Sequence, residues 1–280
     1  MGIRTGRIIG LTALYLGLAI TFVVFTFPFF LLIVNSFKSN GEILTNPFSL
    51  PSHISFSHFP GIFESMHFVN TFKNSIIITV SSVALIIITS AMCAHFLVRN
   101  PNRLNTGIFT GMVASMIIPF QVLMIPMLYI YGQKLGIMLS HPILFLVFLY
   151  VGFGSNFAVF MYHGFIKGIP LELEEAALMD GATRTQTFFR IVVPMLSPIS
   201  STIAILNTLW IWNDFLLPSL VLKDDKDITL PIAITVFRGF YTSDWARLVP
   251  GMLLIIAPLM VVYLFAQRFI IKGVMQGAIK

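Results

Sequence analysis

Chemistry-bearing residues concentrate in one short segment past the middle of the chain, EEAALMDGATRTQTFFRIVVP, at residues 174–194. Glu172, Glu174 and Glu175 follow Pro170, and Gly181 closes the acidic part of the segment. Proline suits the first turn of a helix, acids are stabilised there by the helix dipole, and glycine can end a helix in the left-handed conformation. The pattern predicts a helix of about ten residues, roughly 15 Å long, that carries several acids.

Other candidate chemistry is sparse. The chain contains no Gly-Lys dipeptide, so it lacks the phosphate-binding loop G-x-x-x-x-G-K-[ST] and cannot hydrolyse ATP by that route. Its single cysteine, Cys93, lies in an apolar run, which indicates packing rather than redox chemistry. The spacing of His53, His58 and His67 fits no ordinary zinc site, and we expect no metal site. Any ATP-driven process in which this chain takes part would therefore need an ATPase on another chain.

The elements that position these residues belong in a membrane. Of the 280 residues, 57% are hydrophobic and 10% are charged, and the mean hydropathy is +0.91. Because so few charges cannot cover a soluble globule, the sequence predicts an all-α, polytopic integral membrane protein. The formal net charge is +6, but the basic residues are scattered beside apolar runs instead of forming a patch, which argues against nucleic-acid binding.

Charge-free intervals define the candidate spans. A helix needs about 20 apolar residues to cross a bilayer, and six intervals are long enough, the fifth interrupted only by Asp214. Segment 43–63 is rich in proline and histidine, and we expect an external loop there. The first interval is too long for a signal peptide and should remain as a helix. The predicted spans are approximately 8–37, 74–98, 106–130, 141–166, 191–217 and 248–267.

Six prolines lie within or at the ends of the predicted spans, where they are expected to bend or break helices: Pro28, Pro119, Pro126, Pro194, Pro198 and Pro258. Basic residues set the orientation, because lysine and arginine favour cytoplasmic loops. With the N-terminus inside, the denser set lies on the cytoplasmic side, and both termini are expected there. These inner residues are Arg4, Arg7, Arg99, Arg103, Lys167, Arg184, Arg190, Arg268, Lys272 and Lys280.

The longest cytoplasmic loop, 167–190, contains the acidic segment. Its predicted helix is too short and too acidic to cross the membrane. We expect Leu171, Leu178 and Ala182 to face the spans, with the acids exposed to a partner. The alternative is an ordinary solvated connection between two spans.

Spacing within this loop resembles a known signature. Glu175-Ala176-Ala177 is followed by three residues and Gly181, then by nine residues and the run 191–194, IVVP. This is similar to the EAA motif of inner-membrane permease subunits in binding-protein-dependent ABC importers, with valine at 193 where the family has leucine. WIWNDFLLPSLVL, TLPIAITVFRGFYTSDWARLVPG and QRFIIKGVMQGAIK resemble the MalG-type subunits of the carbohydrate-importing subfamily, and the likeness covers essentially the whole chain.

The resemblance implies a type I ABC importer permease (MetI-like) fold in a bacterial cytoplasmic membrane, importing a carbohydrate, with an oligosaccharide favoured, by alternating access. The implied partners are a second homologous permease subunit, two copies of a cytoplasmic ATPase, which hold the ATP and magnesium, and an extracytoplasmic solute-binding protein. The chain itself would bind no cofactor and would not be an enzyme. The loop helix would be a coupling helix that docks on the ATPase. The implied coupling residues are Glu174, Glu175, Ala176, Ala177, Asp180 and Gly181.

Asn207, Trp210 and Asp214 form a second candidate site on the fifth predicted span. Positions i, i+3 and i+7 fall within about 60° of one another on a helix. Such a polar and aromatic stripe suits sugar hydroxyls and ring faces, so these residues are candidates for the substrate pathway. An acid at the membrane interface is the alternative for Asp214, and helix packing through the amide is the alternative for Asn207.

Two other functional classes stay open. An importer of a non-sugar solute, such as a polyamine or a peptide, would share the loop, although the stretches quoted above argue against it. An ion-coupled secondary carrier would need no ATPase. Such carriers usually contain chains of buried ionisable residues, whereas Asp214 is the one ionised side chain within the predicted spans. We expect His95, near a helix end, to be an interfacial or packed side chain.

Overall fold

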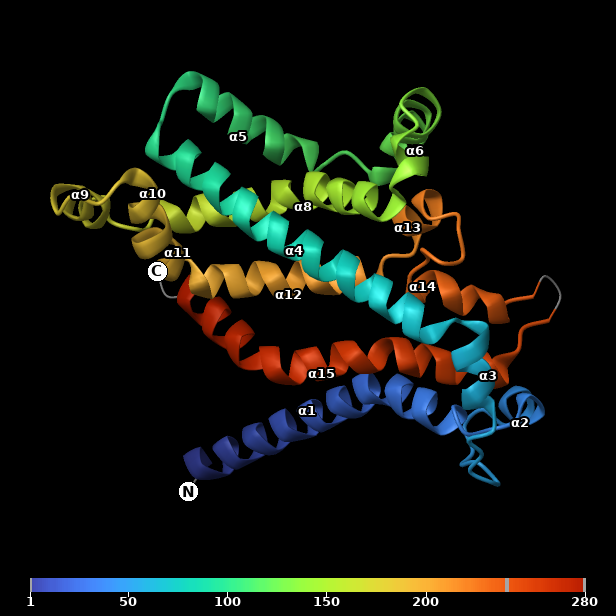
Figure 1. Cartoon of the computed structure of the whole chain (residues 1–280). Coiled ribbons are helices and arrows are strands. Elements are labelled where there is room, and N and C mark those ends of the chain that lie inside the picture. The colour runs from blue at the N-terminus through green and yellow to red at the C-terminus, as the bar shows by residue number, and fades with distance from the viewer. Residues whose placement is uncertain (1, 240–241, 279–280) are drawn as a thin grey trace. The chain divides into compact units, whose positions relative to one another are not determined.

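The computed structural model describes residues 2–239 and 242–278. The predicted all-helical fold is confirmed, because the described residues form helices and turns, with only an isolated bridge between Arg238 and Ser243 (Figure 1). The chain divides into two compact units. The first contains the residues up to Phe68 together with Ile234–Pro258, and the second contains Val69–Ala233 and the residues from Leu259 onward.

The first unit contains α1 (Gly2–Asn35), α2 (Asn40–Thr45), α3 (His58–Ser65), a 3₁₀ turn (Ile234–Phe237) and the beginning of α15 (Trp245–Ala278). Between Gly10 and Phe30, the side chains of α1 are exposed, as suits a helix that lies against lipid or another subunit. Lys38 is fully buried, and its ammonium donates to the carbonyl oxygens of Asn46 and Pro47 at 2.9 and 3.3 Å. These two bonds hold the segment that follows α2.

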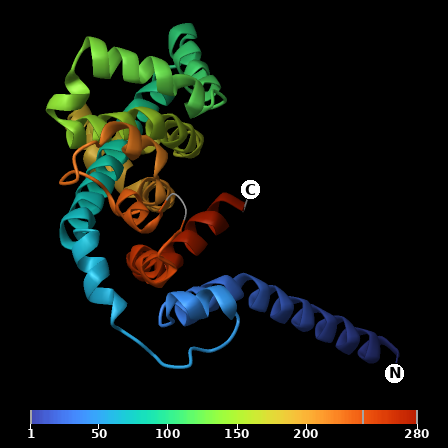
Figure 2. The same cartoon turned by 90° about the vertical axis from the view of Figure 1, so that its right-hand side faces the viewer.

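The second unit is built around α4, the long cyan-to-teal helix in Figure 1 and Figure 2, together with α8 and α12. Its elements are α4 (Phe68–Arg99), α5 (Arg103–Ser115), α6 (Phe120–Met127), a π-helical segment (Leu128–Lys134), α7 (Ile137–Ser140), α8 (Pro142–Ile166), α9 (Glu172–Met179), α10 (Arg184–Thr187), a second π-helical segment (Phe188–Val192), α11 (Val193–Met195), α12 (Ser197–Asn213), α13 (Leu216–Val221) and α14 (Leu230–Ala233).

Close packing holds α4, α8 and α12 together. A Cβ at Gly154 on α8 would lie 2.6 Å from the side chain of Ile86 on α4 and 2.9 Å from that of Asn207 on α12, so any larger residue there would force these two buried side chains to shift. Tyr162 of α8 is fully buried, and its hydroxyl forms a 2.7 Å hydrogen bond with the hydroxyl of Ser200 on α12. This tightly packed apolar core fixes the frame on which the loops are mounted.

Four helical stretches are long and apolar enough to cross a membrane singly: Gly10–Asn35, Phe68–Arg99, Pro142–Ile166 and Trp245–Phe265. Two bent pairs reach that length together: Arg103–Ser115 with Phe120–Lys134, bent by 98°, and Arg184–Met195 with Ser197–Asn213, bent by 73°. If each pair is one span, the described residues contain six spans.

Prolines account for the two bends. Pro119 directly precedes α6, and Pro194 and Pro198 flank the bend before α12. Proline lacks the backbone N–H and disfavours a helical conformation in the residue before it, so a helix readily breaks there. Not every candidate proline breaks a helix. Pro28 and Pro258 lie inside α1 and α15, which continue past them, and Pro126 lies inside α6 just before the first π-helical segment.

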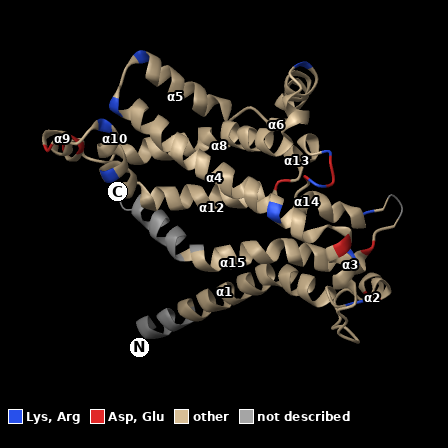
Figure 3. Ribbon diagram, in the orientation of Figure 1, with Lys and Arg blue, Asp and Glu red and all other residues tan. Residues whose placement is uncertain are grey.

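Charged residues gather at two ends of the second unit (Figure 3). One end carries α9, α10 and the connection between α4 and α5; the other carries residues 223–229, here called the outer loop. The outer loop is tied to α4 by hydrogen bonds from Asn70 and Asn74 to the carbonyl oxygen of Lys226. Within the loop, pairing with Asp224 raises the pKa of the Lys226 ammonium.

Candidate functional site

The acidic segment forms α9 and a tight turn. Its three glutamates all lie in the first turn of the helix, as predicted, and α9 ends at Met179. Gly181 has a φ of 88°, so the predicted left-handed glycine is confirmed. Its N–H donates to the carbonyl oxygen of Leu178 at 3.1 Å, and that of Ala182 donates to Ala177 at 3.0 Å. These bonds close the helix and reverse the chain.

A reciprocal cap then starts α10. The hydroxyl of Thr183 accepts from the N–H of Gln186 at 3.3 Å, and the side-chain oxygen of Gln186 accepts from the N–H of Thr183 at 2.8 Å. This capping box satisfies backbone donors that the start of a helix leaves free. The glycine turn and the cap together give the exposed loop between α9 and α10 a defined structure.

Glu174 lies buried at the centre of a charged cluster. Its Oε2 is 2.8 Å from Nε2 of His95, and its Oε1 is 2.8 Å from Nε and 2.7 Å from Nη2 of Arg99. Arg99 Nη2 also donates to the carbonyl oxygen of Ile169 at 3.1 Å. A buried carboxylate is tolerated when both its oxygens are paired in this way. We call Glu174, His95 and Arg99 the inner clamp, because they fasten the first turn of α9 to the last turns of α4.

One prediction about α9 is wrong. Glu174, expected to face a partner with the other acids, is only 7% exposed. Leu171 and Leu178, expected to face the spans, are 46% and 42% exposed but line one hollow with Met92 and Phe96 of α4. The prediction sorted the helix by hydrophobicity alone, but the guanidinium of Arg99, with the imidazole of His95 beside it, draws the acid towards α4. The signal was in the sequence, since residues four apart on a helix, such as His95 and Arg99, lie on one face.

The remaining coupling residues lie on or near the surface. Glu175, Ala176, Asp180 and Gly181 are exposed, and Ala177 is half-buried. Together with the small side chains of the two alanines, this arrangement leaves one side of α9 open to close approach by another protein.

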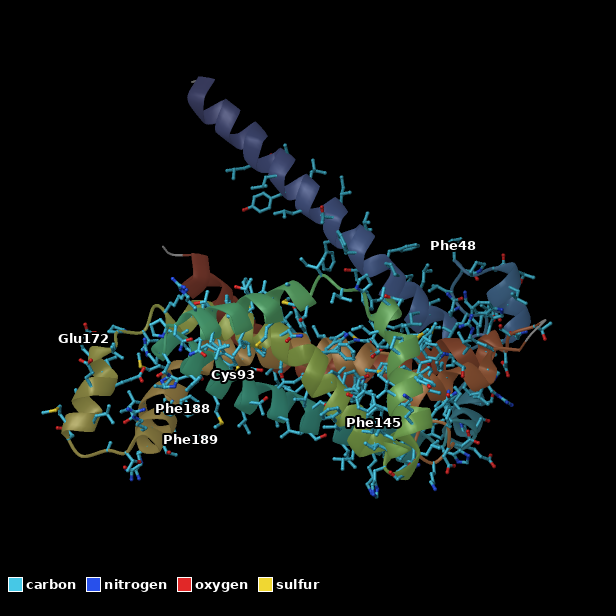
Figure 4. The ribbon with its side chains drawn as sticks, turned by 90° about the horizontal axis from the view of Figure 1, so that it is seen from above. Phe48, Cys93, Phe145, Glu172, Phe188 and Phe189 are labelled. Carbon is cyan, nitrogen blue, oxygen red and sulfur yellow. The ribbon has the colours of Figure 1, made fainter. Side chains whose placement is uncertain are left out.

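A hollow of about 440 Å³ lies beside the inner clamp. Met92 and Phe96 of α4, Leu178 of α9 and the pair Phe188 and Phe189 contribute apolar walls. The ring of Phe188 packs against the clamp, 5.1 Å from the imidazole of His95. Figure 4 shows the two phenylalanines beside α9, with Phe145 at the opposite end of the unit. The described residues contain no group of three or more His, Cys, Asp or Glu arranged to hold a metal ion.

The three residues of the second candidate site differ in burial and in hydrogen bonding. Asn207 is buried, and its amide donates to the carbonyl oxygen of Ile203 at 2.9 Å within α12, so it packs between helices. Trp210 is 41% exposed. Asp214 lies just beyond the end of α12, where its Oδ1 accepts from the N–H of Leu216 at 3.0 Å. All three residues nevertheless face α8, because Asn207 approaches Gly154 and both Trp210 and Asp214 contact Tyr150.

Tyr150 of α8 is the residue that joins two of these three, and the sequence analysis missed it. Its hydroxyl donates to Oδ2 of Asp214 at 3.0 Å. Its ring meets Trp210 edge to face, with ring centres 5.4 Å apart. Because Tyr150 comes from another span, 64 positions away from Asp214, no local spacing could reveal the contact.

Comparisons with known proteins place this arrangement in context. Residues 86–276 match the model of a family described as binding-protein-dependent transport system inner membrane component. Over 253 residues, the chain is 39% identical to a probable starch degradation products transport system permease protein of Thermoanaerobacterium thermosulfurigenes, covering 90% of this chain and 91% of that protein. It is 35% identical over 254 residues to a melibiose/raffinose/stachyose import permease protein of Bacillus subtilis, covering 90% and 91%.

A solved structure shares the fold. A chain of a bacterial ABC transporter involved in the import of the acidic polysaccharide alginate superposes with a TM-score of 0.78 at 21% sequence identity, over 95% of this chain and 97% of that one.

Proposed function

Because the chain belongs to the family of inner-membrane components of binding-protein-dependent transport systems, we propose that it is the permease subunit of an ATP-driven carbohydrate importer. The resemblance inferred from the EAA spacing is thereby confirmed at the level of the family. A carbohydrate is supported by relatives named for starch degradation products and for melibiose, raffinose and stachyose. The sizes of those sugars favour an oligosaccharide as the substrate.

The observation that carries this proposal is the construction of α9. A short acidic helix with an exposed alanine at 176 and an exposed carboxylate at Glu175 stands at the charged end of the second unit, fixed on one side by the inner clamp and on the other by the Gly181 turn. Exposed acids favour a basic partner surface, and complementary charge steers such contacts. The partner that fits is a cytoplasmic ATPase with a basic cleft.

We assign separate roles to the coupling residues. Glu175 and Asp180, both exposed, pair with basic residues of the ATPase, and Ala176 and Ala177 allow its surface to approach closely. Gly181 sets the direction in which the chain leaves α9. In the full assembly, this chain pairs with a second, homologous permease, two ATPase copies dock below, and a solute-binding protein delivers sugar from outside.

The proposed mechanism is alternating access. ATP binding closes the ATPase pair, α9 moves with it, and packed helices shift as rigid groups from an inward-facing to an outward-facing state. Sugar then passes from the binding protein into the cavity, and hydrolysis resets the assembly. Trp210 and Asp214, joined by Tyr150, are the side chains of this chain that we propose to line the sugar path.

Reconstitution in vesicles tests the proposal. The complex of this chain with its partner permease, ATPase and binding protein should import oligosaccharide when ATP is supplied on the ATPase side, and should continue when ionophores collapse all ion gradients. Import that needs a gradient and no ATP would instead establish a secondary carrier. Import of a polyamine or peptide in place of sugars would retain the ATP-driven mechanism and refute the substrate class.

Charge reversal tests the contact surface. Glu175→Lys should weaken retention of the ATPase by the purified permease about tenfold, because it places like charges together at a contact. Asp225→Lys, an equally exposed reversal in the outer loop, is the matched control and should retain the ATPase fully. Equal retention by both variants would remove Glu175 from the contact.

A further inference from the structure

Two adjacent acids in the first turn of α9 have opposite surroundings. The carboxylate of Glu174 is buried and bonded to His95 and Arg99, whereas Glu175 is exposed. Removing one partner from a buried, hydrogen-bonded ion pair is strongly destabilising, because the other charge is left without compensation. The two acids therefore have different functions. Glu175 presents charge to another protein, and Glu174 fastens α9 to its own chain.

The inner clamp joins α9 to a helix that is distant in the sequence. Glu174 is separated from His95 by 79 positions and from Arg99 by 75, so the backbone makes no short connection between α9 and α4. The bond from Arg99 to the carbonyl oxygen of Ile169 also holds the segment that leads into α9. A displacement of α9 therefore reaches the inner end of α4 through these side chains.

The other end of α4 is fastened to the outer loop in a similar way. The amide of Asn74 donates to the carbonyl oxygens of Lys226 at 2.9 Å and Ile228 at 3.1 Å, and the hydroxyl of Ser75 accepts from the N–H of Leu230 at 3.0 Å. Asn74 and Ser75 are both buried, so water does not compete with these bonds. Since α4 has 32 residues, it is about 48 Å long and reaches from one charged end of the unit to the other.

We infer that α4 is a connecting rod between the coupling helix and the outer loop. The inner clamp passes a displacement of α9 to α4, and Asn74 and Ser75 pass it on to the outer loop, on the side where the solute-binding protein docks. This inference rests on the proposed function and extends it, because it couples the nucleotide state of the ATPase to the outer face through one helix. Such coupling acts equally in both directions. Glu174 and Asn74 are positioning residues in this path.

The first test measures the number of sugars imported per ATP hydrolysed, rather than the amount of folded protein. In the reconstituted complex, Glu174→Gln should lower the number of sugars imported per ATP hydrolysed about tenfold, because the clamp loses its negative charge. Glu172→Gln, an exposed acid in the same turn, is the matched control and should keep the wild-type ratio. The ratio reports only on assembled complexes, so a lower yield of folded protein does not change it. A wild-type ratio for Glu174→Gln would overturn the inference.

The second test asks whether the two ends of α4 act as one path. Asn74→Leu should lower the same ratio, and the double variant with Glu174→Gln should be no worse than the more severe single variant, since mutations in one path are not additive. If the fold-reductions of the two single variants instead multiply in the double variant, the inference that α4 connects the two sites is wrong.

A crosslink distinguishes a rigid joint from a contact that opens during the cycle. With Cys93 replaced by serine, His95→Cys combined with Glu174→Cys should uncouple the complex, and bridging the two thiols with a short bifunctional reagent should restore import. Uncoupling that persists after bridging would overturn the inference. Absence of ATP-driven import by the wild-type complex would refute the proposed function itself, whereas wild-type import by the Glu174 and Asn74 variants refutes only the rod.

Discussion

At the scale of single residues, the roles of two neighbouring glutamates are set by their surroundings and not by their residue type. Glu174 and Glu175 are chemically identical neighbours, yet one is enclosed by His95 and Arg99 and the other is open. A carboxylate forms its strongest hydrogen bonds with a charged donor in good geometry, such as the guanidinium of Arg99. The EAA spacing singles out Glu175, whereas the role of Glu174 follows from its contacts in the structure.

Gly181 provides a residue-scale prediction, because its φ of 88° disfavours most side chains. Gly181→Val should strain the turn by about 1–3 kcal/mol, whereas Gly181→Asn should cost less than about 1 kcal/mol, since asparagine tolerates the left-handed region. The measurement is the fraction of permease that retains the ATPase during purification, which should fall for valine and stay near wild type for asparagine. Equal effects of the two substitutions would contradict the role of the backbone conformation.

Tyr150 supports a second prediction at this scale. Tyr150→Phe removes the hydroxyl that donates to Asp214 but keeps the ring that packs on Trp210. A hydrogen bond to a carboxylate is worth about 1.5–3 kcal/mol, against about 1 kcal/mol for a bond between two hydroxyls. Thermal unfolding in detergent should therefore show a larger loss for Tyr150→Phe than for Tyr162→Phe, which loses only its bond to Ser200. The reverse order would contradict the assignment.

At the scale of elements, the approach of α4, α8 and α12 depends on one glycine. Gly154→Ala would place a methyl group 2.6 Å from Ile86 and 2.9 Å from Asn207, and overpacking of this kind costs about 1–3 kcal/mol. Gly152→Ala, on the same helix, meets nothing within 4 Å and should be neutral or slightly stabilising. The measurement is the melting temperature of each variant. Adding Ile86→Ala to Gly154→Ala should restore part of the lost stability, because it removes the side chain that the new methyl group meets. Equal melting temperatures would show that the helices can separate at no cost.

The elements also show what could be predicted from the sequence. Four of the charge-free intervals overlap helices that are long and apolar enough to cross a membrane. The prolines indicated where two further intervals break, but no local pattern gives the bend angles of 98° and 73°. The turn at Gly181 was predictable from one residue. The inner clamp and the contact of Tyr150 were not predicted, because their partners lie 64 to 79 positions apart.

At the scale of the whole molecule, topology depends on whether each bent pair crosses the membrane. The pair Arg184–Met195 and Ser197–Asn213 separates the loop that carries α9 from the outer loop. Basic residues flank its first part, which favours a cytoplasmic start. If the pair is one span, the two loops lie on opposite sides of the membrane; if it turns back, they lie on the same side.

Single cysteines decide between these topologies. With Cys93 replaced by serine, Thr185→Cys and Asp225→Cys place one thiol at an exposed position in each loop. Because irregular backbone is costly in lipid, the bent pair should still traverse the bilayer with its break covered by neighbouring helices. A membrane-impermeant maleimide should therefore label only Asp225→Cys in right-side-out vesicles and only Thr185→Cys in inverted ones. Labelling of both from one side would show a re-entrant segment, and α9 and the outer loop could not then contact partners on opposite faces of the membrane.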